Sequence, residues 1–225
     1  MAYTMKNHRW ILVVAAVLTA DVATAQLYLP VPPTTDESIW QLVLTNAAPR
    51  PTAFRRTIFA PGQPPSPQAL SGLIALQTDI GAQPASGAHM EVVDVLKPGL
   101  NVSSRLVDSQ GHSLRLPVFK VTDVVGRNKP MTFQTLLQPY EDATIVVFSP
   151  TKISVTCSVT LNNNVGGVSS FALSVPALSQ IASRQFVAPA TQVDFARVIC
   201  SRPVLAFAYR GDPPNLEFIP PANSD

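Results

Sequence analysis

The strongest constraint on the fold is a strict alternation of apolar and polar residues over positions 153–161. The apolar members of this run occupy every second position: Ile153, Val155, Cys157, Val159 and Leu161. Successive side chains of a β-strand point to opposite faces, so this pattern predicts a strand with one buried face and one solvated face. Turn-forming residues, NNNVGG, follow at 162–167. We therefore predict that the surrounding stretch, 144–212, consists of antiparallel strands joined by turns.

The rest of the chain favours the same all-β class. Residues 38–46 (SIWQLVLTN) alternate with Trp40 on the inward face, and strand-like runs recur at 52–59, 89–96, 100–107 and 114–125. A short helix competes with a strand only at 68–80, where Gly72 weakens the helical alternative. The 22 prolines in 225 residues belong at turns, linkers and edge strands rather than in helices.

The first residues have the features of an export signal. Lys6 and Arg9 precede an apolar run at 10–20, and Ala23-Thr24-Ala25 forms a small-residue cleavage motif before Gln26. The alternative is a membrane anchor, but the run is shorter than the roughly 20 residues of a membrane span. We predict a signal peptide at 1–25, cleaved between Ala25 and Gln26, and an extended proline-rich tail at 26–37. The mature chain is expected to have no transmembrane span.

The charge balance excludes some partners. The formal net charge is +2 and only 13% of the residues are charged. A nucleic-acid-binding domain normally needs a basic face, so no nucleic-acid partner is expected. The signal peptide predicts a secreted or periplasmic protein of a bacterium, in an oxidising compartment.

The two halves of the chain resemble each other. Residues 40–49 align with 144–153, and residues 90–107 align with 194–210, at an offset of about 104 residues. Alternating patterns also align by chance, so chance likeness is the alternative to an internal duplication. Duplication would give two β-sandwiches of roughly 100 residues, each with about seven short strands.

Cys157 and Cys200 are the only cysteines. An even number of cysteines in an exported protein favours a disulfide bond. We expect Cys157 and Cys200 to be bridged, and a bridge between the two sheets of a sandwich would resemble the staple of immunoglobulin domains. The alternative is a pair of buried free thiols.

No pattern of catalytic or ligand-binding residues stands out. Once the predicted signal peptide is removed, His89 and His112 are the remaining histidines, and two isolated histidines do not make a zinc site. The sequence has no G-x-S-x-G motif and no glycine-rich phosphate loop, and its carboxylates are scattered. We expect a protein that is not an enzyme and has no catalytic residue, metal or cofactor.

The tripeptide Arg210-Gly211-Asp212 matches the integrin-binding motif and follows a strand-like run. An adhesion ligand of this kind has to be displayed on a loop. Gly-Asp-Pro is also ordinary turn chemistry, so a plain turn is the alternative interpretation.

Three segments of the second half carry a pattern known from other proteins. They are Phe148-Ser149-Pro150, Val175-Pro176-Ala177-Leu178-Ser179, and Phe195-Ala196-Arg197-Val198 followed by Ser201-Arg202-Pro203-Val204. With the alternating run and Gly166, they resemble a loose class of exported bacterial immunoglobulin-like β-sandwich modules. The resemblance implies a β-sandwich fold and export, but no activity. Together with the internal repeat, it leads us to expect two immunoglobulin-like β-sandwich domains in tandem. Length and signal peptide also look like those of a periplasmic pilus chaperone.

Three functional hypotheses follow. The leading one is a non-enzymatic cell-surface or periplasmic module, with sandwiches at 38–125 and 143–225 and a junction at 126–142, that binds a protein or cell-surface polymer through edges or loops. Its oligomeric state is open. The second is a chaperone-like assembly factor that works by β-strand pairing. The third is a loop-built hydrolase or carbohydrate-binding accessory. A long unpaired edge strand would favour the second hypothesis, and a deep pocket with a histidine and a carboxylate would favour the third.

Overall fold

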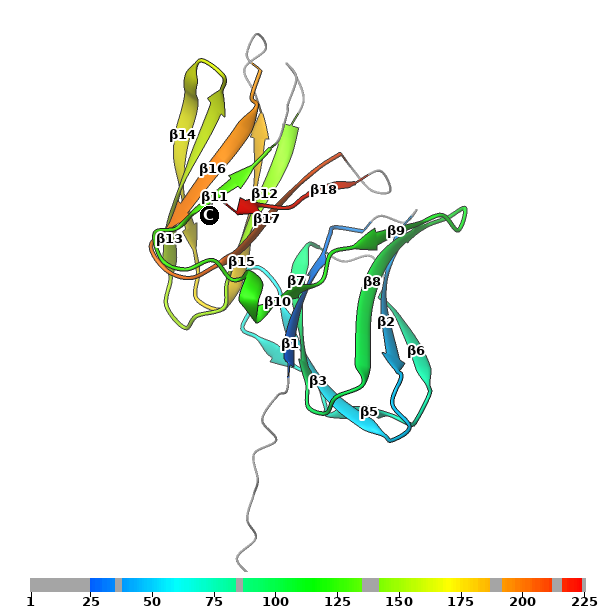
Figure 1. The fold of residues 1–225 in the computed structure, drawn as a ribbon. Coiled ribbons are helices and arrows are strands. Elements are labelled where there is room, and N and C mark those ends of the chain that lie inside the picture. The colour runs from blue at the N-terminus through cyan, green and yellow to red at the C-terminus, as the bar shows by residue number, and fades with distance from the viewer. Residues whose placement is uncertain are drawn as a thin grey trace, which may run out of the picture.

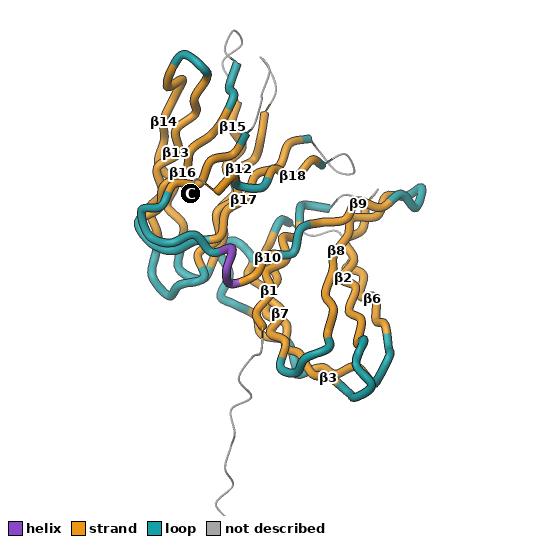
Figure 2. Tube along the Cα trace, viewed as in Figure 1, coloured by secondary structure: helices purple, strands orange, loops and turns teal. Residues whose placement is uncertain are grey.

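The computed structural model describes residues 25–34, 38–83, 87–134, 142–186, 192–211 and 216–223. Most of the predicted signal peptide, residues 1–24, lies outside these ranges. The described residues form antiparallel β-strands and one 3-10 turn, η1 (Val121–Asp123) (Figures 1 and 2). The all-β prediction is therefore confirmed. Within these ranges no helix has the length and apolarity needed to cross a bilayer.

The first half contains two sheets. Sheet 1 has the strand order β6-β2-β8-β9, and sheet 2 has the order β10-β1-β7-β3-β4, with β5 also paired to β3. The strands of sheet 1 are β2 (Ser38–Asn46), β6 (Thr78–Gln83), β8 (Leu100–Asp108) and β9 (Ser113–Leu116). The strands of sheet 2 are β1 (Ala25–Val31), β3 (Thr52–Phe59), β4 (Ser66–Pro67), β5 (Ser71–Leu73), β7 (His89–Val95) and β10 (Phe119–Lys120).

The second half also contains two sheets. Sheet 3 has the order β15-β12-β17-β18, and sheet 4 has the order β14-β13-β16-β11-β19. The strands of sheet 3 are β12 (Asp142–Ser149), β15 (Ser179–Phe186), β17 (Leu205–Arg210) and β18 (Glu217–Ile219). The strands of sheet 4 are β11 (Pro130–Phe133), β13 (Val155–Asn163), β14 (Gly166–Val175), β16 (Phe195–Cys200) and β19 (Ala222–Asn223).

The two halves follow the same order of strand pairing. In sheet 2, β7 lies between β1 and β3; in sheet 4, β16 lies between β11 and β13. Likewise, β2 and β8 form the centre of sheet 1, and β12 and β17 form the centre of sheet 3. The registers agree as well, because Trp40 faces Leu106 and Thr144 faces Tyr209. The sequence comparison aligns these positions of β2 with β12 and of β8 with β17.

Alternation in the sequence becomes burial in the structure. Along β2, Trp40, Leu42 and Leu44 are buried, and along β13 every second residue from Val155 to Leu161 is buried. Burying one large apolar side chain contributes about 1.5–3 kcal/mol. One core lies between sheets 1 and 2, and a second core lies between sheets 3 and 4. The architecture is thus sandwich-like in each half.

Sheet 3 is buried on both faces and joins the two halves. Val147 belongs to the core shared with sheet 4, whereas its neighbour Phe148 packs with residues of the first half. The Phe148 ring centroid lies 5.8 Å from that of Tyr28 and 5.3 Å from that of Phe59. Both partners come from sheet 2, so the halves meet through an apolar interface rather than only through the chain that connects them.

Residues 26–31 of the segment expected to be an N-terminal tail belong to sheet 2. β1 begins one residue before this segment, and it pairs with β7 along its length and with β10 at Leu27 and Tyr28. Pro30 lies beyond the residues that β10 covers, so its missing N–H removes no bond to that strand. The segment expected to be a junction, 126–142, likewise contains β11, which pairs with β16.

The short helix considered for residues 68–80 is absent from this described stretch. β5 and the first residues of β6 occupy it instead. The buried side chain of Asn46 donates hydrogen bonds to the carbonyls of Leu73 (3.3 Å) and Ile74 (2.9 Å), which anchors the chain between β5 and the turn at 75–76. Tertiary hydrogen bonds therefore outweigh a weak local helical tendency here.

Candidate functional site: the β14 edge

β14 is the longest strand at a sheet edge among the described residues. It has 10 residues and pairs only with β13 in sheet 4. The other edge strands of four or more residues each contain a charged residue: Arg184 in β15, Asp79 in β6 and Arg115 in β9. β14 reads GGVSSFALSV and has no charge and no proline. It lies at the margin of the second half that points away from the first half (Figure 1).

A tight hairpin places β14 beside β13. The N–H of Val165 donates to Asn163 Oδ1 at 3.1 Å, and the N–H of Asn164 donates to Asp194 Oδ2 at 2.7 Å. Gly166 has φ +146°, a conformation that favours glycine. Pro176 follows the last residue of the strand and limits its extension. These local features fix where the edge begins and ends.

The backbone direction of β14 follows from its neighbours. Ser201 N–H donates to the Thr156 carbonyl at 2.9 Å, so the adjacent pair Cys157–Cys200 is a non-hydrogen-bonded pair of β13 and β16. The N–H and C=O of Cys157 therefore point to β14, where Leu173 is its partner. By alternation, the N–H and C=O groups of Ser170, Ala172 and Ser174 point away from β13, toward the open edge.

The side chains of β14 separate into two faces. Leu173 and Val175 are buried in the core of the second half. Phe171 is half-buried at the rim of that core, together with Val168 and Ile181. Ser170, Ala172 and Ser174 are exposed on the opposite face and are small. An added strand would thus meet unpaired backbone groups in one plane and an apolar rim on one side.

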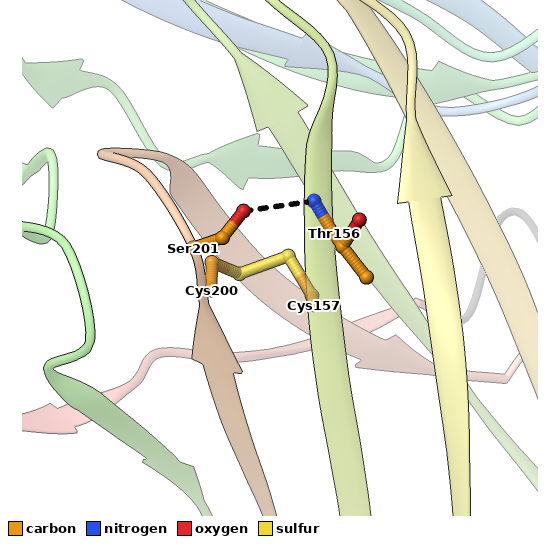
Figure 3. Close-up of a disulfide and its surroundings, with 4 residues drawn as sticks. All are labelled: Thr156, Cys157, Cys200 and Ser201. Atoms are coloured by element: carbon orange, nitrogen blue, oxygen red, sulfur yellow. Dashed lines mark hydrogen bonds between the residues drawn. A yellow bond between two sulfur atoms is a disulfide. The ribbon is translucent and has the colours of Figure 1, made fainter.

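The disulfide bond lies one strand away from this edge. Cys157 and Cys200 are bonded and buried, and they face each other directly across β13 and β16 (Figure 3). The predicted bridge is confirmed, but the expectation of a bridge between two sheets is wrong. Both cysteines lie in sheet 4, at a non-hydrogen-bonded pair where Cα atoms approach most closely; here the Cα–Cα distance is 4.0 Å. The bond therefore fixes β13, the strand with which β14 pairs, to β16.

The matching edge of the first half is built differently. β4 and β5 occupy the place beside β3 that β14 occupies beside β13. They have 2 and 3 residues, and β4 contains Pro67. Short strands and proline are among the ways in which proteins block pairing at a sheet edge. The edge beside β3 in the first half is therefore blocked against further strand pairing, whereas the β14 edge in the second half is not.

A buried ion pair lies in the first half. Arg56 donates from Nη2 to Glu91 Oε1 at 2.8 Å and from Nε to Glu91 Oε2 at 3.1 Å, and Glu91 is fully buried. His89 Nε2 lies 3.6 Å from Glu91 Oε1, beyond hydrogen-bonding distance. Burial alone would raise the pKa of Glu91, but the His89 ring and the Arg56 guanidinium outweigh it and hold the pKa below its ordinary value.

This histidine and carboxylate do not line an open pocket among the described residues. A cavity of about 10 Å³ touches His89 together with Gln180 and Tyr209 at the interface of the halves. That volume corresponds to about one water molecule. A larger groove of about 730 Å³ lies near η1 and includes Phe119, Asp123 and Lys129. Its lining has no histidine beside a carboxylate, and the described residues contain no cluster that could hold a metal ion.

The remaining predicted sites fall at two strand ends. Ala25 and Gln26, the predicted cleavage residues, begin β1, where Gln26 donates to Asp94 at 2.8 Å. Arg210 ends β17 and forms an ion pair with Glu217 of β18. Gly211 follows with φ +80°, and Asp212 lies outside the described residues. The Arg210 side chain is thus engaged by its own sheet, which weakens the adhesion hypothesis.

His112, the second histidine of the predicted mature chain, lies on an exposed turn. Its Nδ1 atom is 2.9 Å from Asp108 Oδ2.

Two of these features were not predicted from the sequence. The stretch 144–212 was predicted to consist of strands and turns, but β14 was not identified within it as an edge strand. The signal that was present is the absence of charge and proline from the whole of 153–175, the turn included. Glu91 was counted only among scattered carboxylates, because an apolar run such as β7 gives no sign of a partner on another strand. No protein-family model, curated protein or solved structure matches this chain.

Proposed function

We propose that this chain is an exported, non-enzymatic interaction module that binds an extended polypeptide segment by adding it as a strand to β14. The single observation that carries the proposal is the 10-residue edge without charge or proline. Edges of this kind are templates for pairing with another chain, and proteins that do not use them block them. β4 and β5, which occupy the matching edge of the first half, are short and include a proline, and this contrast supports a binding role for the unblocked β14 edge.

The chemistry of binding is that of β-augmentation. Ser170, Ala172 and Ser174 would supply main-chain donors and acceptors, which give affinity without requiring a particular sequence. The half-buried Phe171, Val168 and Ile181 would contact apolar side chains of the added strand, which gives preference for a segment with alternating apolar residues. The buried disulfide supports this role, since a rigid template loses less entropy on binding.

The architecture supports a wider proposal about origin. The shared pairing order supports two tandem sandwich units derived by internal duplication, one from β1 to β10 and one from β11 to β19. We regard these units as immunoglobulin-like in having two packed antiparallel sheets each. The disulfide is compatible with an oxidising compartment, as a signal peptide and export to the periplasm or outside the cell would require.

Selection of peptides tests the proposed function. A phage-displayed library of random decapeptides is selected on the mature protein, and hydrogen exchange is measured with a selected peptide. We expect the amides of Ser170, Ala172 and Ser174 to become protected. Ala172→Pro removes one outward N–H that the described fold does not use, and should reduce peptide affinity at least tenfold. Ala172→Val keeps the N–H and serves as the matched control.

Two results would contradict the proposal. The first is a selected peptide that protects amides elsewhere and leaves those of β14 unchanged. The second is equal peptide affinity for Ala172→Pro and Ala172→Val. Circular dichroism and thermal melting of both variants establish that they are folded, and Ser170→Pro tests the same loss at another outward position.

A further inference from the structure

The outward residues of β14 are arranged symmetrically about Ala172. Ser170 and Ser174 lie on either side of it, at the same distance along the strand, and all three direct their N–H and C=O groups to the open edge. An antiparallel copy of the same strand can therefore pair in a register centred on Ala172. Ser170, Ala172 and Ser174 of one copy would face Ser174, Ala172 and Ser170 of the other, and every outward group of these residues would gain a partner.

Charge also favours this pairing. β13 and β14 carry no charged residue, so two copies bring no like charges together along the strands. Arg197 of β16 faces Thr160 in the middle of β13 and is separated from β14 by that strand, while charges of opposite sign lie near the two ends of the hairpin. Asp194 accepts a hydrogen bond from Asn164 at the tip, and Lys152 lies beside Thr151, whose carbonyl accepts from Leu178 at the base. Antiparallel pairing directs the tip of one copy toward the base of the other, which places opposite charges at matching ends.

Exposed apolar residues follow the same division. Val165 is 88% exposed at the tip of the hairpin, and Ile153 is 52% exposed at its base. An antiparallel arrangement directs Val165 of one copy toward Ile153 of the other copy. Pairing through β14 joins two five-stranded sheets into one and leaves neither β14 edge open. The contact is isologous, so it closes as a dimer rather than extending into a fibre.

We infer that the occupant of the β14 edge is a second copy of this chain, paired antiparallel about a two-fold axis at Ala172. This inference rests on the proposed function, in which β14 accepts a strand, and it names that strand. It also explains why an uncharged edge is tolerated, because the edge is covered in the assembled state.

Cysteine cross-linking tests the register. In an antiparallel hydrogen-bonded pair the two Cα atoms lie about 5.5 Å apart, within the range of a disulfide bond. Ala172→Cys should therefore form an intermolecular disulfide under mild oxidation and migrate as a covalent dimer. Ser158→Cys is the matched control, because Ser158 is exposed on the same face and directly faces Ala172 on β13. Its distance to its own copy would be roughly 14 Å, too far for a bond.

The outcomes separate the two proposals. We expect sedimentation equilibrium of the mature protein to give twice the monomer mass, and Ala172→Pro to shift it to the monomer. A monomeric wild-type protein at about 100 μM, or equal cross-linking of Ala172→Cys and Ser158→Cys, overturns the dimer; about 100 μM corresponds to only modest affinity. If the protein is monomeric and a selected decapeptide still protects the β14 amides, the proposed function stands and self-pairing fails. If neither occurs, both fail.

Discussion

The two halves of this protein pair their strands in the same order but stabilise corresponding places differently. In sheet 4, Cys157 and Cys200 form a disulfide across β13 and β16. In sheet 2, the corresponding pair across β3 and β7 is Phe54 and Val95, both buried. The equivalence rests on the hydrogen bond just beyond each pair: Leu96 N–H to the Ala53 carbonyl at 3.0 Å, like Ser201 to Thr156. An apolar contact and a covalent bond thus occupy the same position.

Further along the same strands, it is the first half that carries the more specialised residue. Glu91 pairs with Ile58 in sheet 2, and the corresponding pair in sheet 4 is Ala196 with Leu161. The first half therefore has a buried carboxylate where the second has a methyl group. The two edges differ as well, since prolines and short strands close one and the other is open. A shared pairing scheme fixes the framework, while single positions decide how each half is stabilised and what it can bind.

Removal of the buried charge should have the largest effect on stability. Glu91→Gln leaves the Arg56 guanidinium without an anionic partner inside sheet 2, and breaking such a pair costs about 3–5 kcal/mol. Because Arg56 keeps some exposure to solvent, we expect a value near the lower end. Urea unfolding measures the change. Asp94→Asn, on the same strand but the opposite face, is the control and should cost less than about 1 kcal/mol. Equal losses of unfolding free energy in the two variants would show that the Glu91 ion pair contributes no more to stability than Asp94 does.

Loss of the disulfide should have the next largest effect. The bond joins residues with a separation of 43, and a native bridge contributes about 2–4 kcal/mol. The double substitution Cys157→Ala, Cys200→Ala should lower the free energy of unfolding by that amount. Cys157→Val with Cys200→Val should recover part of it, because the first half shows that an apolar pair fits this position. A variant with valines as unstable as the one with alanines would contradict that equivalence.

The sequence predicted the strands well because one buried face imposes alternation. β2 and β13 were identified from this signal, and their inward residues are those expected. It predicted less well where both faces are buried. β7 packs toward sheet 1 on one face and toward sheet 3 on the other, so its residues do not alternate and Glu91 gave no sign of its role. Alternation shows that a strand has a buried face but not which strand lies beside it.

Which strands pair with each other is the main feature that the sequence did not predict. The cysteines were predicted to bond from their number and compartment, yet whether the bond lies within a sheet or between sheets depends on strand order. The edge position of β14 depends on strand order as well. Its first residues, Gly166 and Gly167, belong to the turn signal and hid the true length of the strand. Tertiary pairing decides these features, and a single sequence does not encode it in a local pattern.

The smallest effect concerns pH and arises at Glu91 in the first half. The pKa of Glu91 in the folded protein lies below its ordinary value of 4.5. The ionised carboxylate therefore stabilises the fold above about pH 4.5, and this contribution is lost as the pH falls through the lower, folded-state pKa. The midpoint of urea unfolding should decrease between pH 5 and pH 3. Replacing the pair together, Arg56→Met with Glu91→Leu, should flatten that decrease without a large change at pH 7, since apolar residues of similar volume substitute well for buried ion pairs. An unchanged slope in the double variant would assign the acid sensitivity to surface carboxylates shared by both halves, and the contrast between Glu91 and Ala196 would then have no consequence for acid stability.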